Sequence, residues 1–281
     1  MKYASYLNPA GVATWGSVED GAVTDLGPTG AGVADCLRSA IQAGVLATAS
    51  SDGAPVYDED GITFLPVIPD PGKIICVGTN YAAHQAESGI APAIPPIFTR
   101  FADTQIGHLA PARLPAETEQ FDWEGELAIV IGAEVDHAPA SEGWSKVAGV
   151  AIYNDLSARD WQRKSGQWTP GKNFPGTGAF GPYFVPMSDF DDIEARKLVT
   201  RVNGEVRQQA TLGDMVFGVP ELLEFISTWT VLRPGDVVVT GTPGGVGLFM
   251  DPPTFLADGD VVEVEIDGLG VLRNAVELSA R

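Results

Sequence analysis

The sequence is poor in cysteine, histidine and positive charge. Its 281 residues include two cysteines and three histidines, and 17 Lys+Arg stand against 37 Asp+Glu. The net charge of −20 predicts repulsion from nucleic-acid phosphates and anionic lipid surfaces, so we expect no nucleic-acid partner. Cys36 and Cys76 are too few for a disulfide scaffold, and their apolar surroundings predict free, buried thiols.

Long hydrophobic runs are also missing. No uninterrupted apolar run approaches the roughly 18 residues that a membrane-spanning helix requires. The first residues, 1–16, lack the long apolar stretch after a basic start that is typical of a signal peptide. These absences predict a protein that does not associate with membranes and that resides in the cytoplasm.

Several common catalytic motifs are absent from the sequence. It has no Gly-x-x-x-x-Gly-Lys-Ser/Thr phosphate loop, no Gly-x-Gly-x-x-Gly and no Gly-x-Ser-x-Gly. Three scattered histidines without cysteine pairs do not make a zinc site. These absences disfavour the common nucleotide-binding enzymes, serine hydrolases and zinc enzymes.

The patterning of apolar residues predicts a β-rich fold. The 33 glycines and 21 prolines imply many turns. Short apolar runs at 73–78, 126–132 and 237–241 predict buried strands, and the alternation at 261–266 predicts a half-exposed one. Helices are expected over 33–44, 141–147 and 220–227.

A proline-rich segment divides the sequence into two parts. Residues 66–71 contain three prolines within six positions, which is typical of a linker. We therefore predict a small N-terminal domain over residues 1–70 and a larger domain over residues 71–281.

Three acidic residues alternate at Asp122, Glu124 and Glu126. On an extended strand they point to one face, where they repel one another unless they share a cation. Hard carboxylate oxygens suit Mg²⁺, Mn²⁺ or Ca²⁺. An exposed acidic edge is the alternative, but Glu126 leads directly into an apolar strand and needs a partner there.

A second polar segment follows the apolar run at 147–152. Asp155 falls at the end of this predicted strand, where it offers a further carboxylate. Arg159 and Gln162 lie one helical turn apart and suit a carboxylate or keto oxygen. The alternative is that the short polar side chains here merely cap a helix.

A histidine and a glutamate are spaced as neighbours on a helix. His84 and Glu87 lie at positions i and i+3, so the carboxylate can orient the imidazole as a general base for water. A surface ion pair is the alternative reading. The glycine and prolines that follow at 89–96 indicate that this segment forms a mobile lid.

Two glycine-rich segments come later in the chain. In 171–182, Lys172 among glycines can approach an anionic substrate, or it is simply an exposed lysine in a turn. In 241–247, the backbone N–H groups and the Thr242 hydroxyl can bind an oxyanion, or the segment is a tight hairpin.

The order of these segments is more specific than any one of them. VGTNYAAHQAES, FDWEGELAIVIG, YNDLSARDWQ, GKNFPGTGAFGP and PGDVVVTGTPGGVG occur in one chain. Over about residues 72–278 the sequence resembles the fumarylacetoacetate hydrolase family. The resemblance implies an α+β, β-rich fold, namely a mixed β-sandwich roll with a small N-terminal domain, and a homodimer.

The resemblance also implies roles for individual residues. The expected roles are metal ligands for one Mg²⁺ or Mn²⁺ per subunit (Glu124, Glu126 and Asp155), a catalytic base pair (His84 and Glu87), a lysine beside the metal (Lys172), and substrate contacts (Arg159, Gln162 and Thr242). Asp122 falls outside the ligand trio, and we place it behind the ligands.

The sequence departs from the family pattern at two positions. Thr79 stands where leucine is commoner, and Arg100 stands where many members have lysine. Because a subgroup of the family pairs such an arginine with a Gly-His like residues 107–108, we interpret Arg100 as a second contact for a substrate carboxylate. A structural salt bridge is the alternative.

The family chemistry implies a keto-acid substrate. Our leading expectation is metal-dependent hydrolysis of the C–C bond of an acylpyruvate, such as fumarylpyruvate or maleylpyruvate, in aromatic or sugar-acid catabolism. The alternatives are an oxaloacetate decarboxylase, a 2-hydroxyhepta-2,4-diene-1,7-dioate isomerase/decarboxylase and a 2,4-diketo-3-deoxy sugar acid hydrolase. A non-enzymatic alternative is an inactive, metal-binding scaffold.

Overall fold

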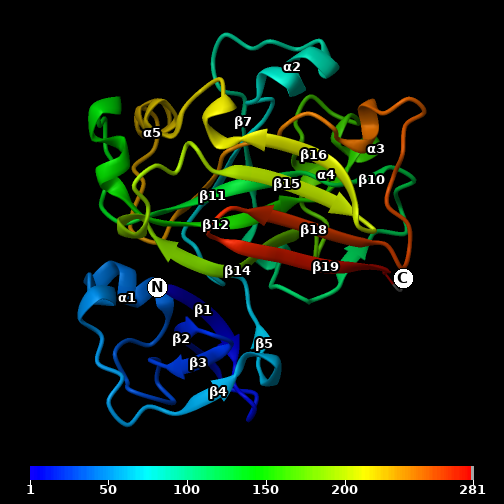
Figure 1. Cartoon of the computed structure of the whole chain (residues 1–281). Helices are drawn as coiled ribbons and strands as arrows, with labels where there is room; N and C mark the ends of the chain where they lie inside the picture. Colours follow the sequence, from blue (N-terminus) through cyan, green and yellow to red (C-terminus); the bar gives the residue numbers. More distant parts are fainter. Residues whose placement is uncertain (280–281) are drawn as a thin grey trace.

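The computed structural model describes residues 1–279 and is dominated by strands, as the sequence predicts (Figure 1). The five α-helices are short, and the longest has nine residues. The strands are β1 (Lys2–Leu7), β2 (Ala13–Glu19), β3 (Ala22–Asp25), β4 (Val56–Asp58), β5 (Thr63–Phe64), β6 (Ile74–Val77), β7 (Ile97–Arg100), β8 (Gln105–Ile106), β9 (Ala112–Leu114), β10 (Phe121–Asp122), β11 (Gly125–Ile131), β12 (Val147–Asp155), β13 (Ser157–Ala158), β14 (Gly178–Pro186), β15 (Lys197–Val202), β16 (Glu205–Thr211), β17 (Val237–Val239), β18 (Val261–Ile266) and β19 (Gly270–Leu278). The helices are α1 (Leu37–Ala43), α2 (Ala82–Ser88), α3 (Arg159–Gln162), α4 (Thr169–Lys172) and α5 (Val219–Ser227).

Two main sheets organise the described chain. The larger runs in the order β4-β3-β2-β1-β14-β12-β11-β17-β6-β7, with β5 paired to β1 and β8 to β14. A five-stranded sheet, β16-β15-β18-β19-β9, covers one face of its central part (Figure 1). The short pair β10-β13 lies beside them. The result is a β-rich α+β fold.

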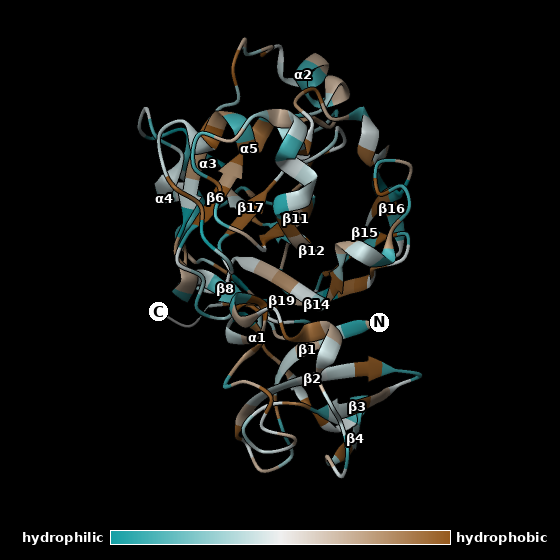
Figure 2. Cartoon of the chain, turned by 90° about the vertical axis from the view of Figure 1, so that its left-hand side faces the viewer, coloured by the Kyte–Doolittle hydropathy of each residue, from teal (hydrophilic) through white to brown (hydrophobic). Residues whose placement is uncertain are grey.

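Strand β11 shows why the centre of the large sheet is entirely apolar. All of its residues are buried because both faces are covered. Leu127 and Ile129 pack toward the five-stranded sheet. Ala128 and Val130 belong to a second core that includes α1, which lies in the N-terminal lobe (residues 1–70). This split follows the two-residue period of a strand. Figure 2 shows the same apolar colouring on β6, β11 and β17.

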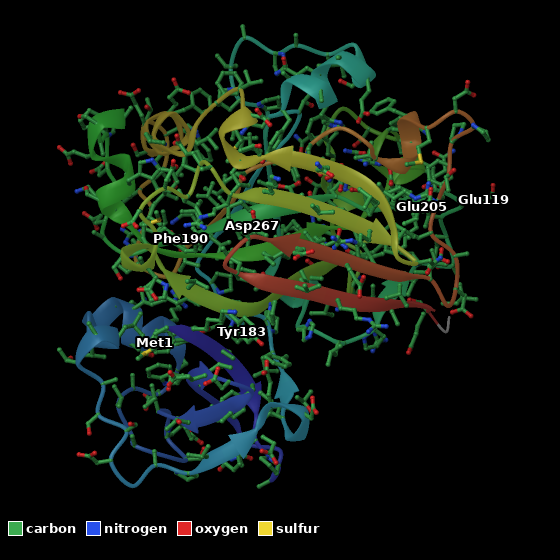
Figure 3. The ribbon with its side chains drawn as sticks, viewed as in Figure 1. Met1, Glu119, Tyr183, Phe190, Glu205 and Asp267 are labelled. Atoms are coloured by element: carbon green, nitrogen blue, oxygen red, sulfur yellow. The ribbon has the colours of Figure 1, made fainter. Side chains whose placement is uncertain are left out.

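The N-terminal lobe is joined to the rest by a strand pair and a shared core. Residue Tyr3 of β1 pairs with Phe184 of β14. The ammonium of Lys2 lies 4.8 Å from the ring centroid of Tyr183, and the N-terminal amine forms an ion pair with Asp189. Figure 3 shows Met1 and Tyr183 at this junction. The domain boundary at residue 70 stays a prediction.

The predicted linker at 66–71 is more tightly packed than expected. Val67 and Ile68 are fully buried in the shared core. Val67 accepts a hydrogen bond from Ser5 Oγ at 2.8 Å, and its N–H donates to Phe180 O at 3.2 Å. Proline spacing signals an extended chain, but it does not tell whether that chain is solvated or packed.

The predicted helices are found, with one change of type and one later start, since the helix expected over 33–44 begins at Leu37. Helix α1 ends at Gly44, whose φ of 67° is the left-handed conformation that glycine adopts without strain. Helix α5 begins with proline in its first turn, as predicted. The segment predicted as a helix at 141–147 is a 3₁₀ helix over Ala140–Lys146. Within the described chain, no helix is long and apolar enough to cross a membrane.

His108 makes the fold sensitive to acid. Burial, assisted by Arg273, lowers the pKa of His108 to about 4, and its Nδ1 accepts the Arg273 N–H at 3.0 Å. The unfolded chain therefore binds the proton first, and stability is lost as the pH falls from about 6.5 toward 4. His108→Asn keeps an acceptor for the Arg273 N–H. Between about pH 6.5 and pH 4 we expect its free energy of unfolding, measured with urea, to fall by about 1–3 kcal/mol less than that of the wild type. An unchanged pH dependence would contradict this assignment.

Candidate active site

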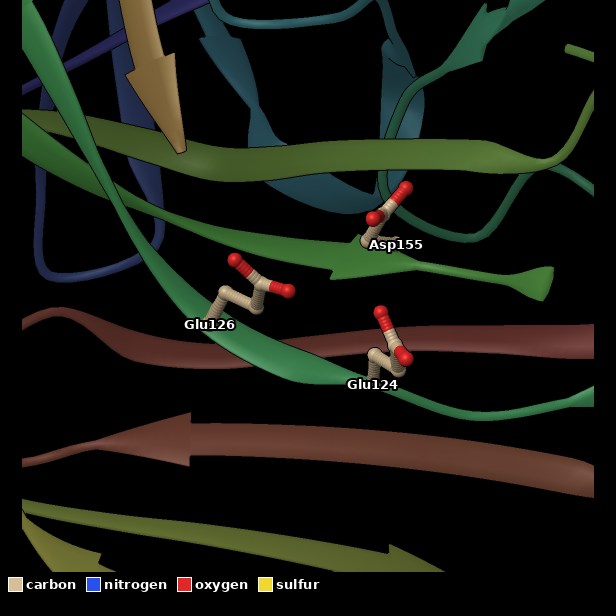
Figure 4. A group of neighbouring side chains, drawn as sticks. All are labelled: Glu124, Glu126 and Asp155. Carbon is tan, nitrogen blue, oxygen red and sulfur yellow. The ribbon is translucent and has the colours of Figure 1, made fainter. Parts of the chain in front are cut away.

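The strand register brings three carboxylates to one place. In the β11–β12 pair, Glu126 lies opposite Tyr153, and Asp155 N donates to Glu124 O at 2.9 Å. Residues two apart share a face, so Glu124, Glu126 and Asp155 all project to the same side. Their carboxylate oxygens lie within 4.8 Å of one another, and all three residues are buried (Figure 4).

Basic side chains neutralise part of this charge. Lys172 donates to Glu124 at 2.5 Å and to Asp155 at 2.6 Å, and Arg159 contacts Glu124 at 2.5 Å. Burial opposes ionisation of Glu124, but Arg159 and Lys172 outweigh it and lower its pKa to about 2. Burial alone would lower the pKa of Lys172, yet Asp155 and Glu124 raise it, so this lysine is charged.

Glu126 differs from its two neighbours because it has no cationic partner in the described chain. Its one hydrogen bond comes from Gly241 N at 2.5 Å. Burial, followed by Asp155 and Glu124, raises its pKa well above the usual value. Four buried carboxylates, Asp122 included, thus face three buried cationic side chains. A divalent cation would more than offset the one negative charge left over, and oxygen-only ligands suit Mg²⁺ or Mn²⁺.

Asp122 connects Arg159 to the end of the glycine-rich turn at 241–247. It accepts Arg159 Nε at 2.8 Å, Gly247 N at 2.8 Å and Leu248 N at 3.0 Å. It therefore holds Arg159 beside Glu124 and fixes the segment that carries Leu248 and Phe249, as expected for a residue behind the ligands. Arg159 also donates to Gln162 at 3.2 Å, across the single turn of α3.

The predicted histidine–glutamate pair forms in α2. His84 Nδ1 lies 2.7 Å from Glu87 Oε1, and Glu87 Oε2 accepts Gly245 N at 2.9 Å. The carboxylate assigns the proton to Nδ1, which leaves Nε2 as the basic nitrogen. Glu87 therefore links α2 to the same glycine-rich turn at 241–247 and orients the imidazole of His84.

Thr242 is held by a residue that the sequence analysis did not identify. Its hydroxyl donates to Gly125 O at 3.0 Å and accepts Gln208 Nε2 at 2.8 Å. Gln208, from β16 of the second sheet, also contacts Pro243 O at 2.9 Å and Gly125 N at 3.0 Å. It thus supports both the turn and the backbone between Glu124 and Glu126. Because β16 contains several polar residues, the sequence pattern did not distinguish Gln208 from its neighbours.

Gln208 therefore predicts a stability effect. The Gln208→Leu substitution leaves Gly125 N and Pro243 O without a partner and removes the hydrogen bond that Thr242 Oγ accepts, so we expect a loss of about 2–5 kcal/mol in the free energy of unfolding. Gln209→Leu, at the exposed neighbouring position, is the matched control and should change it by less than about 0.5 kcal/mol. Equal effects of the two substitutions would refute this role. Urea unfolding measures both.

One small cavity of about 150 Å³ connects these groups. Its polar lining comes from His84, Glu124, Glu126, Arg159, Gln162, Lys172 and Thr242. Phe98, Trp168, Leu248 and Phe249 supply much of its apolar lining. The cavity is smaller than the roughly 300–1,000 Å³ of drug-sized ligand sites, which favours a small substrate. Arg159 Nη2 is buried here without a partner in the described chain, so it is free to bind a substrate oxygen.

Arg100 does not line this cavity. Its side chain is fully buried, forms an ion pair with Asp155, and donates to Thr177 Oγ1 at 2.6 Å. The structural salt bridge, which the sequence left open, is therefore the interpretation that the geometry supports. Contact with a substrate carboxylate would require Arg100 to leave Asp155. Thr79, the other departure from the family pattern, does line the cavity.

Titratable groups from separate segments of a β-rich fold thus converge on one cavity, an arrangement typical of an enzyme active site. Residues 73–277 match the model of the fumarylacetoacetate hydrolase C-terminal domain. The chain belongs to the fumarylacetoacetate hydrolase family, which confirms the family and fold expected from the sequence.

Three relatives illustrate the range of the family. A mitochondrial oxaloacetate tautomerase of Bos taurus is 42% identical over 225 residues, covering 79% of this chain and 72% of that protein. An oxaloacetate tautomerase of Bacillus subtilis is 39% identical over 80% of this chain and 76% of its own length. The solved fumarylacetoacetate hydrolase of Exiguobacterium antarcticum is 35% identical, with a TM-score of 0.88 over 99% of this chain and 100% of that one.

Proposed function

We propose that the protein catalyses the keto–enol tautomerisation of oxaloacetate with the help of a divalent cation. The observation that carries the proposal is the position of His84, which Glu87 orients and which lines the same small cavity as Glu124, Glu126 and Arg159. The two tautomerases among the relatives support this substrate. Oxaloacetate is a short diacid, in keeping with the size of the cavity.

The cation-binding residues of this proposal are Glu124, Glu126 and Asp155, which would hold one Mg²⁺ or Mn²⁺. A cation there would stabilise negative charge that develops on a keto oxygen. Lys172 lies against two of the three carboxylates and keeps its own charge. Arg159 Nη2 would hold a substrate carboxylate or keto oxygen.

The proton transfer falls to His84. Its Nε2 takes a proton from C3 of the keto form, and the electrons of the C3–H bond form the C2–C3 double bond while the carbonyl electrons move to the C2 oxygen. Return of this proton from Nε2 to the C2 oxygen gives the enol and restores the neutral imidazole. Glu87 stabilises the imidazolium that exists between the two steps.

A second candidate is the acylpyruvate hydrolysis expected from the sequence. The same His84–Glu87 pair can deprotonate a water that attacks the distal carbonyl, and the C–C bond then breaks to release pyruvate as its enolate. Lys172 would stabilise the attacked carbonyl oxygen, because the Thr242 hydroxyl already donates to Gly125 O. Fumarylpyruvate and maleylpyruvate are the test substrates.

The remaining expectations stay predictions. Decarboxylation of oxaloacetate, isomerisation of a heptadienedioate and cleavage of a diketo-deoxy sugar acid would use the same enolate chemistry. The intact set of titratable groups favours an enzyme over an inactive scaffold. The homodimer and the cytoplasmic location also stay predictions.

Proton NMR in D₂O separates these reactions in one series of samples. Tautomerisation is expected to accelerate the exchange of the C3 protons of oxaloacetate in the presence of Mg²⁺, with no more pyruvate than in the same sample without enzyme. Decarboxylation would give pyruvate from oxaloacetate, and C–C hydrolysis would give pyruvate and fumarate from fumarylpyruvate. No acceleration with oxaloacetate would refute the first proposal, and pyruvate from fumarylpyruvate would establish the second.

A further inference from the structure

We infer that Trp168 determines how long a substrate the protein accepts, by separating the catalytic cavity from a neighbouring groove. The inference rests on the proposed function, because it assumes a keto acid whose oxygens lie at the carboxylate and lysine end. It concerns the part of the cavity that Phe98 and Trp168 line.

Trp168 and Phe98 line two adjoining hollows of the structure. One is the catalytic cavity, and the other is a groove of about 500 Å³ whose lining includes Pro96, Thr99 and Thr169. Their two side chains therefore stand between the hollows. Removal of the indole would join a small cavity to a space about three times as large.

The indole is held in place by its neighbours. Gly78 lies directly against it: a Cβ at this position would come within 2.2 Å of the indole ring. Phe98 contacts Trp168 edge to face, with ring centroids 5.5 Å apart. A larger residue at 78 would displace the indole, so the glycine allows the ring to close the cavity.

Trp168 and Lys172, a charged residue of the site, lie on the same short segment. Trp168 immediately precedes α4, which ends at Lys172. The Lys172 ammonium lies 4.9 Å from the centroid of the Phe98 ring. Phe98 thus lies against both Lys172 and Trp168. The chain of a keto acid that is bound at Lys172 and extends along Phe98 therefore meets the indole and must stop there.

Binding of straight-chain 2-keto acids, from pyruvate to 2-oxooctanoate, tests the partition without turnover. We propose calorimetry with Mg²⁺ on the wild type, Trp168→Ala and Trp168→Phe. The wild-type affinity should fall once the chain reaches the indole. In Trp168→Ala the affinity should instead rise by about fourfold per added methylene, as expected for apolar burial. Trp168→Phe, which keeps a ring against Phe98, should lie between the two.

The controls separate this inference from the proposed function. Trp229→Ala removes an indole that is 53% exposed and outside both hollows, and should leave the chain-length profile unchanged. Superimposable profiles for the wild type and Trp168→Ala would refute the partition. A shifted profile in a protein that does not act on oxaloacetate would refute the proposed function alone. Failure of every keto acid to bind the wild type would refute both.

Discussion

We expect the His84→Ala substitution to lower kcat for oxaloacetate tautomerisation by about 10²- to 10⁴-fold, the usual contribution of a positioned general base. His84 is the group that offers a free ring nitrogen to the cavity, since Glu87 engages Nδ1 at 2.7 Å. Proton transfer would then depend on water, while Glu124, Glu126 and Asp155 would still hold the proposed cation for substrate binding. The loss should therefore appear in kcat more than in KM.

A second histidine–carboxylate pair offers a matched control. His137 Nδ1 lies 2.7 Å from Asp136 Oδ1, but the imidazole side chain is 72% exposed and does not line the cavity. His137→Ala should leave kcat unchanged. Glu87→Gln should cause a smaller loss than His84→Ala, because the amide still contacts the ring without the negative charge. Full activity of His84→Ala would refute its role as base.

The Glu126→Gln substitution should move metal affinity and stability in opposite directions. Removing a residue that only hydrogen-bonds to a metal ligand typically weakens metal binding by about 10- to 100-fold. Removing a ligand itself should therefore weaken Mg²⁺ binding by at least about 100-fold. The same substitution removes a buried carboxylate that has no cationic partner in the described chain. The metal-free protein should therefore gain about 1–3 kcal/mol of stability.

Mg²⁺ titration calorimetry and urea unfolding in EDTA measure the two effects. Glu205→Gln is the control, because it makes the same chemical change at an exposed acid with a side chain that is 67% accessible. It should alter neither quantity. Retained Mg²⁺ affinity in Glu126→Gln would contradict its assignment as a ligand, and a less stable metal-free protein would contradict the argument from unpaired charge.

Much of the candidate site could be predicted because its residues lie at the ends of apolar strands. The run that became β11 placed Glu126 at a buried strand's entrance, and the run that became β12 placed Asp155 at a strand's end. Spacing alone put His84 and Glu87 on one helix face. That the carboxylates meet was implied by the family resemblance but not by local pattern, and the β11–β12 register, which is a tertiary property, brings them together.

Other features depend on contacts between distant segments, which local patterns do not encode. Gln208 reaches the site from a separate sheet, and Trp168 matters because Gly78 and Phe98 lie against it. The contact of Arg100 with Asp155 joins residues 55 positions apart. The burial of Val67 and Ile68 likewise depends on β1 and β14. Such contacts follow from the packing of the whole chain.

Mg²⁺ titration of the rate at which oxaloacetate enol converts to the keto form, in EDTA-treated protein, is the most direct test. Loss of the enol's ultraviolet absorbance reports the rate. The account predicts a near-absent enzymatic rate without metal, which is restored to a plateau at one Mg²⁺ per chain. An undiminished rate in EDTA, or no acceleration at any Mg²⁺ concentration, would contradict a cation-assisted keto-acid enzyme built on Glu124, Glu126 and Asp155.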